Sequence, residues 1–211
     1  MDAMKMLGTD AVGVGDRDLR FGYARLRERA DRDKLPLVVS NLTLKAGRQP
    51  AFEPYVIKKI GAVTVGVFGL ISDKADLGPA RDSLVALDPA VTTKRVIAEM
   101  QKKGATVIVM LSQLGKVESE DLLSAVDGID VAILGRSIPL VQKGRLIKNT
   151  VVVYGGEQGQ YLGRSIVTLD ASRHARTNEN EMFILGPEVG EKKEVAAVVQ
   201  GSEDKFNETL R

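Results

Sequence analysis

The sequence predicts an α/β fold in which the later strands form or extend a second sheet. Short runs rich in β-branched residues alternate with amphipathic helical segments as far as Leu134. Beyond that point strands follow one another without helices between them, a pattern typical of a second layer of strands. The 211 residues are 44% apolar and 27% charged, which suffices for one globular domain with a buried core.

In the first half of the chain, glycine and proline mark where the helices and turns fall. Gly8 and Gly104 are suited to end helices, Pro89 to begin one, and the pair at residues 61–62 to turn a hairpin. The predicted elements, in order, are a helix over 1–7, a strand over 10–15 with a polar turn at 16–18, a surface helix over 21–33, a strand over 36–44, paired strands over 55–60 and 63–71, and a helix over 89–103.

The second half begins with the same alternation and then changes. Ser119, followed by acidic residues, is a helix start signal. The predicted elements are a buried strand over 106–111, a helix over 119–126, a buried strand over 130–134, strands over 150–154, 163–169 and 181–185, and a polar segment of helical spacing over 191–210. We therefore expect one domain over residues 1–190. Residues 191–211 are expected to be a helical tail or the start of a connection to a further region.

The amino-acid composition excludes several kinds of functional site. The absence of cysteine excludes disulfides, thiolate metal ligands and a cysteine nucleophile. A net charge of +2 gives no indication of nucleic-acid binding, and no apolar run approaches the roughly 18 residues of a membrane span. No signal peptide is visible in this chain. The single histidine, His174, lies in a polar segment, where a solvated loop residue is the simpler interpretation.

Five collinear segments together resemble a known family. They are residues 6–21 (MLGTDAVGVGDRDLRF), 35–41 (LPLVVSN), 55–70 (YVIKKIGAVTVGVFGL), 104–115 with 128–138 (GATVIVMLSQLG and GIDVAILGRSI), and 155–170 (GGEQGQYLGRSIVTLD). In order and spacing they resemble the catalytic domain of 5′-nucleotidases and related calcineurin-like metallophosphoesterases. The resemblance implies a two-sheet αββα sandwich. It also implies that the first core strand is lacking, because that strand and two metal-binding blocks would precede Met1.

The resemblance implies hydrolysis of phosphoesters, nucleotides among them, by two divalent metals such as Zn or Mn about 3.5–4 Å apart. The family's Gly-Asn-His-Asp, Ser-His-Leu-Gly and Gly-His-Ser-His blocks correspond here to Gly15-Asp16-Arg17-Asp18, Ser112-Gln113-Leu114-Gly115 and Gly135-Arg136-Ser137-Ile138. Arginine stays protonated and cannot ligate a metal, isoleucine has no donor atom, and glutamine is a poor neutral ligand. Asp16 alone is left as a metal candidate. We therefore expect no bound cofactor, no assignable catalytic residue and no activity in the chain as it stands.

Two interpretations of the arginines remain open. Arg17 and Arg136 could bind a phosphorylated or anionic small molecule by paired hydrogen bonds, with Ser40 and Asn41 facing the same cavity by analogy. Alternatively, the arginines pair with Asp16 and Asp18 and fill the former metal cavity with ions of opposite charge. We prefer the ion pair, because it neutralises both charges within the protein.

Three functions fit these observations. The chain is a non-catalytic scaffold or part of a larger exported protein, a binding module for an anionic small molecule, or a metal-dependent nucleotide hydrolase that needs residues outside this chain. An incomplete sheet would expose a strand edge, so another chain or domain covering it is an expected partner. Nucleic acid and a membrane span are not expected. A periplasmic or extracellular location, and a role in nucleotide catabolism, follow from the resemblance alone.

Overall fold

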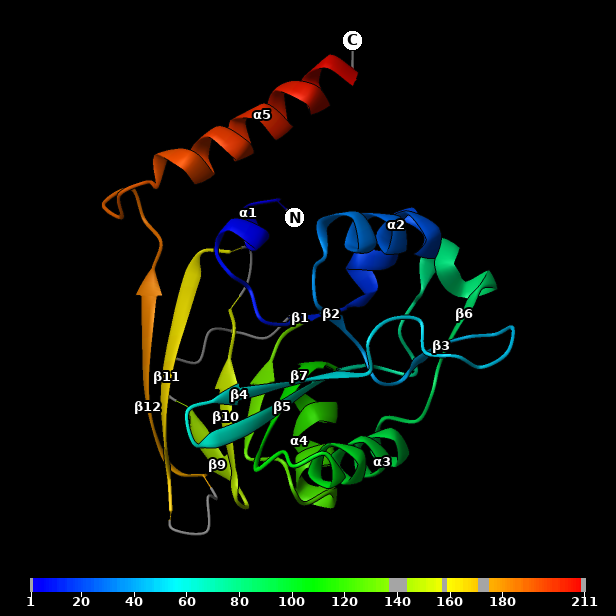
Figure 1. The fold of residues 1–211 in the computed structure, drawn as a ribbon, viewed down its shortest axis with the longest axis vertical. Helices are drawn as coiled ribbons and strands as arrows, with labels where there is room; N and C mark the ends of the chain where they lie inside the picture. Colours follow the sequence, from blue (N-terminus) through cyan, green and yellow to red (C-terminus); the bar gives the residue numbers. More distant parts are fainter. Residues whose placement is uncertain (1, 137–143, 157–158, 171–174, 210–211) are drawn as a thin grey trace.

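The computed structural model describes residues 2–136, 144–156, 159–170 and 175–209, and a six-stranded sheet forms its centre (Figure 1). The strand order is β4-β5-β7-β8-β10-β9. The inner strands β5, β7, β8 and β10 are parallel, and the outer strands β4 and β9 pair antiparallel to their neighbours. The strands span Tyr55–Ile60 (β4), Val63–Ile71 (β5), Val107–Gln113 (β7), Val131–Leu134 (β8), Arg145–Ile147 (β9) and Thr150–Tyr154 (β10).

Two helices cover one face of this sheet, as Figure 1 shows below the strands: α3 (Pro89–Lys102) and α4 (Lys116–Ala125). Asp88 caps α3 by accepting a hydrogen bond from the Val91 N–H, and Pro89 occupies its first turn. Met100 of α3 and Leu123 of α4 are fully buried against the inner strands. Each crossover thus buries one apolar helix stripe on an apolar sheet face, which is the driving force for this layer.

Three separate strand pairs cover the opposite face instead of one continuous second sheet. They are β1 (Val12–Gly13) with β2 (Leu37–Val38), β3 (Leu42–Leu44) with β6 (Leu84–Ala86), and β11 (Tyr161–Leu169) with β12 (Ala175–Ile184). The 3-10 helices η1 (Asp16–Phe21) and η2 (Gly78–Asp82) and the helix α2 (Tyr23–Asp33) pack around β1, β2, β3 and β6 and bury a second core that includes Leu19 and Leu42. The predicted α/β sandwich is confirmed, with its second layer divided into pairs.

Several predicted elements differ in their bounds. The strand predicted over 36–44 forms two strands, β2 and β3. The first pairs with β1 as far as Val38, and the second pairs with β6. Helix α4 begins at Lys116, three residues before the predicted start, and the Ser119 hydroxyl bonds the Gly115 carbonyl from inside the helix. Strand β12 begins before the predicted residue 181, and β6 and β9 were missed because three residues give no visible period.

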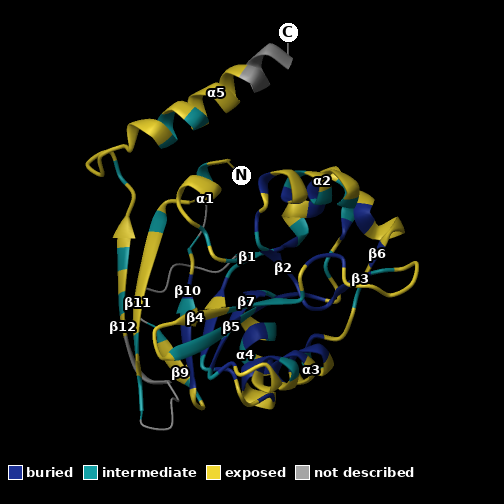
Figure 2. Ribbon diagram, in the orientation of Figure 1, coloured by how far each residue is buried: buried dark blue, intermediate teal, exposed yellow. Residues whose placement is uncertain are grey.

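The two terminal helices lie close to each other. Helix α1 (Asp2–Met6) contacts α5 (Lys193–Thr209), and the described side chains of α5 are exposed or half-buried (Figure 2). The predicted helix over the tail is confirmed, although the domain boundary at residue 190 stays a prediction. Among the described residues, none of the helices has the length and apolar character needed to cross a membrane.

The two layers meet at a backbone contact that leaves no room for a side chain at Gly69. The Ser40 N–H donates to the Gly69 carbonyl at 2.8 Å, which joins the segment after β2 to β5. A Cβ placed on Gly69 would lie 2.2 Å from the Val38 carbonyl oxygen. Only glycine permits this approach, because the obstructing atom belongs to the backbone and cannot rotate away.

We therefore expect Gly69→Ala to lower the unfolding free energy by about 1–3 kcal/mol, the usual cost of forcing an extra group into a packed core. Chemical denaturation of the purified chain measures this change. Gly190→Ala is the control, because a Cβ there meets no atom within 4 Å. Equal stabilities for the two variants would contradict the close-packing argument.

Candidate functional site

Three loops from different strands converge at one edge of the fold, after β1, β7 and β8. Gln113, at the end of β7, lies between the other two loops. A Cβ on Gly15 would lie 3.3 Å from the Gln113 Oε1, and one on Gly135 would lie 2.7 Å from its Nε2. Because the carboxyl ends of parallel strands share an edge, this is where such folds gather functional side chains. The structure thus brings together the three sequence blocks singled out above.

An ion pair joins two of these loops. The Arg136 Nη2 lies 3.0 Å from the Asp16 Oδ2, and the two side chains are only 30% and 22% exposed. Arg136 has a positive φ of 62°, a conformation that costs energy for a residue with a Cβ. This geometry supports the preferred interpretation for Arg136, in which arginine and Asp16 neutralise each other.

Asp18 serves the same loop in another way. Its carboxylate accepts a hydrogen bond of 2.8 Å from the Gly15 N–H, which holds the first turn of η1. Burial raises the pKa of the Asp18 carboxyl above its usual 3.8, and the negative charge of Asp16 raises it further, while the bond from Gly15 acts in the opposite direction. Asp18 is therefore a structural acceptor in an environment that disfavours its charge.

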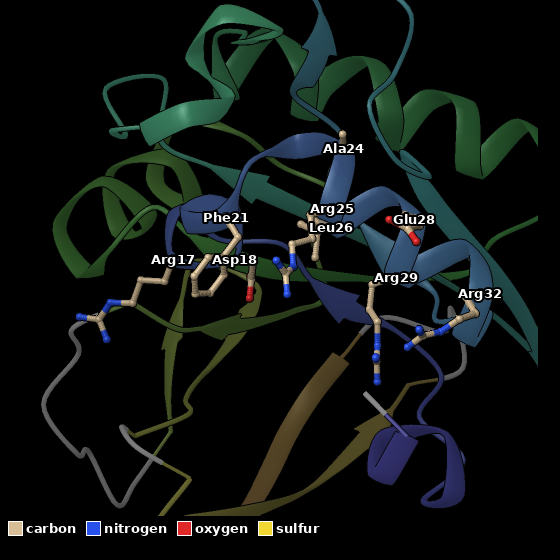
Figure 3. A pocket seen from close by; sticks show the side chains of 9 residues that line it. All are labelled: Arg17, Asp18, Phe21, Ala24, Arg25, Leu26, Glu28, Arg29 and Arg32. Carbon is tan, nitrogen blue, oxygen red and sulfur yellow. The ribbon is translucent and has the colours of Figure 1, made fainter. Parts of the chain in front are cut away.

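Arg17 is one of the residues that line a groove along α2 (Figure 3). The groove has a volume of about 810 Å³, and Arg136 is not among the residues that line it. At the other end of the groove, Arg29 bonds Asp2 and Asp33, and Arg32 bonds Asp33. The use of Arg17 and Arg136 together in one anion site stays a prediction.

The sequence analysis did not identify Phe21 and Arg25 in this groove. The Phe21 ring is 74% exposed, and the Arg25 guanidinium carbon lies 5.7 Å from its centroid. Arginines 25, 29 and 32 recur at helical spacing, so one basic helix face was the available signal. Asp18 and Glu28 line the same groove and offset part of its positive charge.

Ser40 and Asn41 are buried and use their side chains on backbone groups. The Ser40 hydroxyl donates to the Pro54 carbonyl. The Asn41 amide donates to the carbonyls of Ile71 and Leu87 and accepts the Ile71 N–H. These bonds tie the second layer to β5 and give both residues a structural role. Ligand binding by Ser40 and Asn41 stays a prediction.

Two further predicted positions, Ile138 and His174, lie outside the described residues. Within the part of the chain that the structure describes, no three His, Asp or Glu side chains gather where they could hold a metal ion. The donors that do converge fit a metal pair poorly: Asp16 is bonded to a guanidinium, Asp18 to a backbone N–H, and Gln113 is neutral. We derive no catalytic step through a metal from this set.

Comparison with known proteins gives relatives in sequence. No family model matches the chain. The uncharacterized metallophosphoesterase YunD of Bacillus subtilis is 25% identical over 216 residues, which cover 100% of this chain and 46% of the relative. The trifunctional nucleotide phosphoesterase protein YfkN of the same species is 29% identical over 222 residues, covering 86% of this chain and 15% of the relative. The chain thus spans less than half the length of these curated relatives.

Solved structures agree on the fold. The 5′-nucleotidase precursor of Thermus thermophilus superposes with a TM-score of 0.86 at 22% identity, covering 99% of this chain and 45% of that one. The calcineurin-like phosphoesterase YfkN of Bacillus subtilis gives a TM-score of 0.81 at 20% identity, covering 100% and 74%. The relatives are metallophosphoesterases and 5′-nucleotidases, and this chain has their fold.

The Asp16–Arg136 pair should contribute measurably to stability. In a double-mutant cycle with Asp16→Asn and Arg136→Met, we expect a coupling energy of about 1 kcal/mol that falls at high salt. The exposed pair of Lys148 and Asp127 is the control, with an expected coupling of about 0.3 kcal/mol or less. Denaturation of each variant gives the values, and zero coupling between Asp16 and Arg136 would contradict the structure.

The raised pKa of Asp18 predicts a pH dependence. The folded state holds the Asp18 proton more tightly than the unfolded state, so this group makes stability fall as pH rises from 3.8 towards the raised folded value. Asp18→Asn retains a side-chain oxygen for Gly15 and removes the titration. We expect the difference in stability between the variant and the natural chain to shift in favour of the variant across this interval. A difference that stays constant with pH would refute this.

Proposed function

We propose that this chain, which is related in sequence and fold to metallophosphoesterases of the 5′-nucleotidase type, is a non-catalytic domain of that type. It serves as a scaffold or as part of a larger exported protein. The observation that carries the proposal is the ion pair between Asp16 and Arg136 at the converging strand ends. A guanidinium there supplies the positive charge that a metal would supply in a working phosphoesterase.

The local electrostatics support this reading. A divalent cation approaching Asp16 would have to displace Arg136 and then remain close to its permanent positive charge. Gln113 of β7 lies between the loops of Gly15 and Gly135 and adds no negative charge. The pair is therefore a stable arrangement of this cavity without a metal.

A larger assembly is supported by the comparisons. The chain corresponds to 46% of YunD and 15% of YfkN, so the activities of those whole proteins need not reside in the matched part. An exported location rests on the family resemblance alone. Helix α5 leaves most of its described surface exposed (Figure 2), and in this proposal it carries the connection to a further region.

The alternative is a metal-dependent phosphoester or nucleotide hydrolase that needs residues outside this chain. The names of two relatives, YunD and the nucleotide phosphoesterase YfkN, favour it. It requires that a metal ion replace Arg136 as the partner of Asp16 and that the Arg136 side chain move away from the site.

Hydrolysis assays separate the two functions. With a chromogenic phosphate diester or AMP, and Mn²⁺ or Zn²⁺ added, we expect no turnover above the metal-containing buffer, because the converging side chains cannot hold a metal pair. Elemental analysis of the purified chain should find no tightly bound metal. Turnover that disappears in Asp16→Asn, or two metal equivalents per chain, would overturn the proposal.

A further inference from the structure

The groove along α2 combines an exposed aromatic ring with positive charge. Phe21, the last residue of η1, is 74% exposed, and the Arg25 guanidinium carbon lies 5.7 Å from the centroid of its ring. Figure 3 shows the two side chains next to each other. Aromatic residues and arginine are the residue types that are enriched where proteins contact one another. The Phe21–Arg25 contact therefore marks this groove as a candidate interaction surface.

Positive charge exceeds negative charge among the side chains of the groove. Four arginines and two acids line it: Arg17, Arg25, Arg29, Arg32, Asp18 and Glu28. Arg29 and Arg32 are both bonded to Asp33. Within the part of the chain that the structure describes, Arg17 and Arg25 form no ion pair. The unneutralised charge therefore lies at the end of the groove that holds Phe21.

A second contact between arginine and phenylalanine shows what distinguishes this one. On the β11–β12 hairpin the Arg164 guanidinium carbon lies 5.8 Å from the Phe183 centroid. Arg164 also forms an ion pair of 2.6 Å with Glu181, and Phe183 is only 43% exposed. At Phe21 and Arg25 both the ring and the charge are open to a partner. The groove thus suits a partner that brings negative charge together with an apolar or aromatic group.

The folded chain already places a carboxylate from another segment on this row of arginines. The Arg29 Nη2 donates to the Asp2 Oδ2 at 3.2 Å, so an acid of α1 lies on a guanidinium of α2. Arg25 comes four residues earlier, about 6 Å along the helix axis. Alternate side chains of an extended polypeptide recur at about 6.6 Å. Closely spaced acidic side chains of a peptide therefore match the spacing of these arginines.

The acidic residues of the lining favour a polypeptide over a nucleic acid. A nucleic acid carries a phosphate at every residue, and its charge would be repelled by Asp18 and Glu28, which line the same groove. A polypeptide offers N–H donors to these carboxylates and carries its own negative charge only on certain side chains. The mixture of charges in the groove therefore fits an acidic peptide better.

We propose that this groove binds an acidic segment of a partner protein, with a carboxylate on Arg25 and an apolar or aromatic side chain on the ring of Phe21. The guanidinium holds the acid by charge-assisted hydrogen bonds, and the ring contributes apolar contact area. Neither Asp16 nor Arg136 lines the groove. The inference is therefore independent of whether that ion pair marks a catalytic or a non-catalytic site.

A defined peptide tests binding. We expect acetyl-Glu-Glu-Phe-Glu-Glu-amide, added at up to millimolar concentration in low salt, to shift the NMR resonances of the Phe21 ring and the Arg25 side chain. Binding should weaken at physiological ionic strength, because exposed charges are screened. Peptides with glutamine in place of every glutamate, or alanine in place of phenylalanine, should bind at least about tenfold more weakly. Absence of binding by the first peptide, or equal binding by the glutamine peptide, would overturn the proposal.

Matched variants locate the contact. Phe21→Ala and Arg25→Gln should each weaken binding of the glutamate peptide at least about fivefold, because each removes one of the two proposed anchors. Phe183→Ala and Arg164→Gln make the same changes in the hairpin pair and should leave binding unchanged. All four side chains are exposed, and circular dichroism checks that each variant is folded. Unchanged binding in both groove variants would refute the assignment.

A charge reversal and a second class of ligand complete the test. Arg25→Glu should lose binding of the glutamate peptide and gain binding of acetyl-Lys-Lys-Phe-Lys-Lys-amide, a reversal that a purely structural role for Arg25 would not produce. If the lysine peptide gains nothing, Arg25 does not contact the ligand and the proposal fails. AMP or a short oligouridylate that binds more tightly than the glutamate peptide and shifts the same Phe21 resonances would assign the groove to a nucleotide, which overturns the proposed occupant.

Discussion

The contact of the segment after β2 with β5 is the constraint on which this fold depends. At Gly69 the two backbones approach so closely that the Ser40 N–H reaches the Gly69 carbonyl. The Asn41 side chain then bonds three backbone groups, from Ile71 and Leu87, and fixes the second layer in register on the central sheet. Because β1 pairs with β2, this attachment also fixes the loop that begins at Gly15 and carries Asp16.

That attachment decides how charge is arranged at the strand ends. Because β1 lies over β7, the loops after β1, β7 and β8 meet. Their polar groups therefore pair with one another. Arg136 forms an ion pair with Asp16, and the Gly15 N–H donates a hydrogen bond to Asp18. Gln113 fills the space between the two glycines. Each of the two carboxylates therefore has a donor within the protein.

The second layer also leaves part of the central sheet uncovered. Among the described strands β1 pairs with β2, and Val167 and Leu169 of the β11–β12 hairpin pack on Val131 and Val151 of the sheet. Between them Ile133 remains partly exposed. The same layer thus closes the strand ends around the Asp16–Arg136 pair and leaves part of β8 exposed.

The sequence by itself determined the alternating strands and helices through β8, the hairpin of β4 and β5 and the tail helix, because periodicity and punctuation by glycine and proline are local properties. That the three blocks meet was implied by the family resemblance alone. The sequence could not give the three-residue strands β6 and β9, or the structural use of Ser40 and Asn41. It also left open which arginine would pair with Asp16. Only the tertiary structure decided that Arg136 does so while Arg17 helps to line the α2 groove, because the position of each side chain depends on backbone geometry and on neighbours distant in sequence.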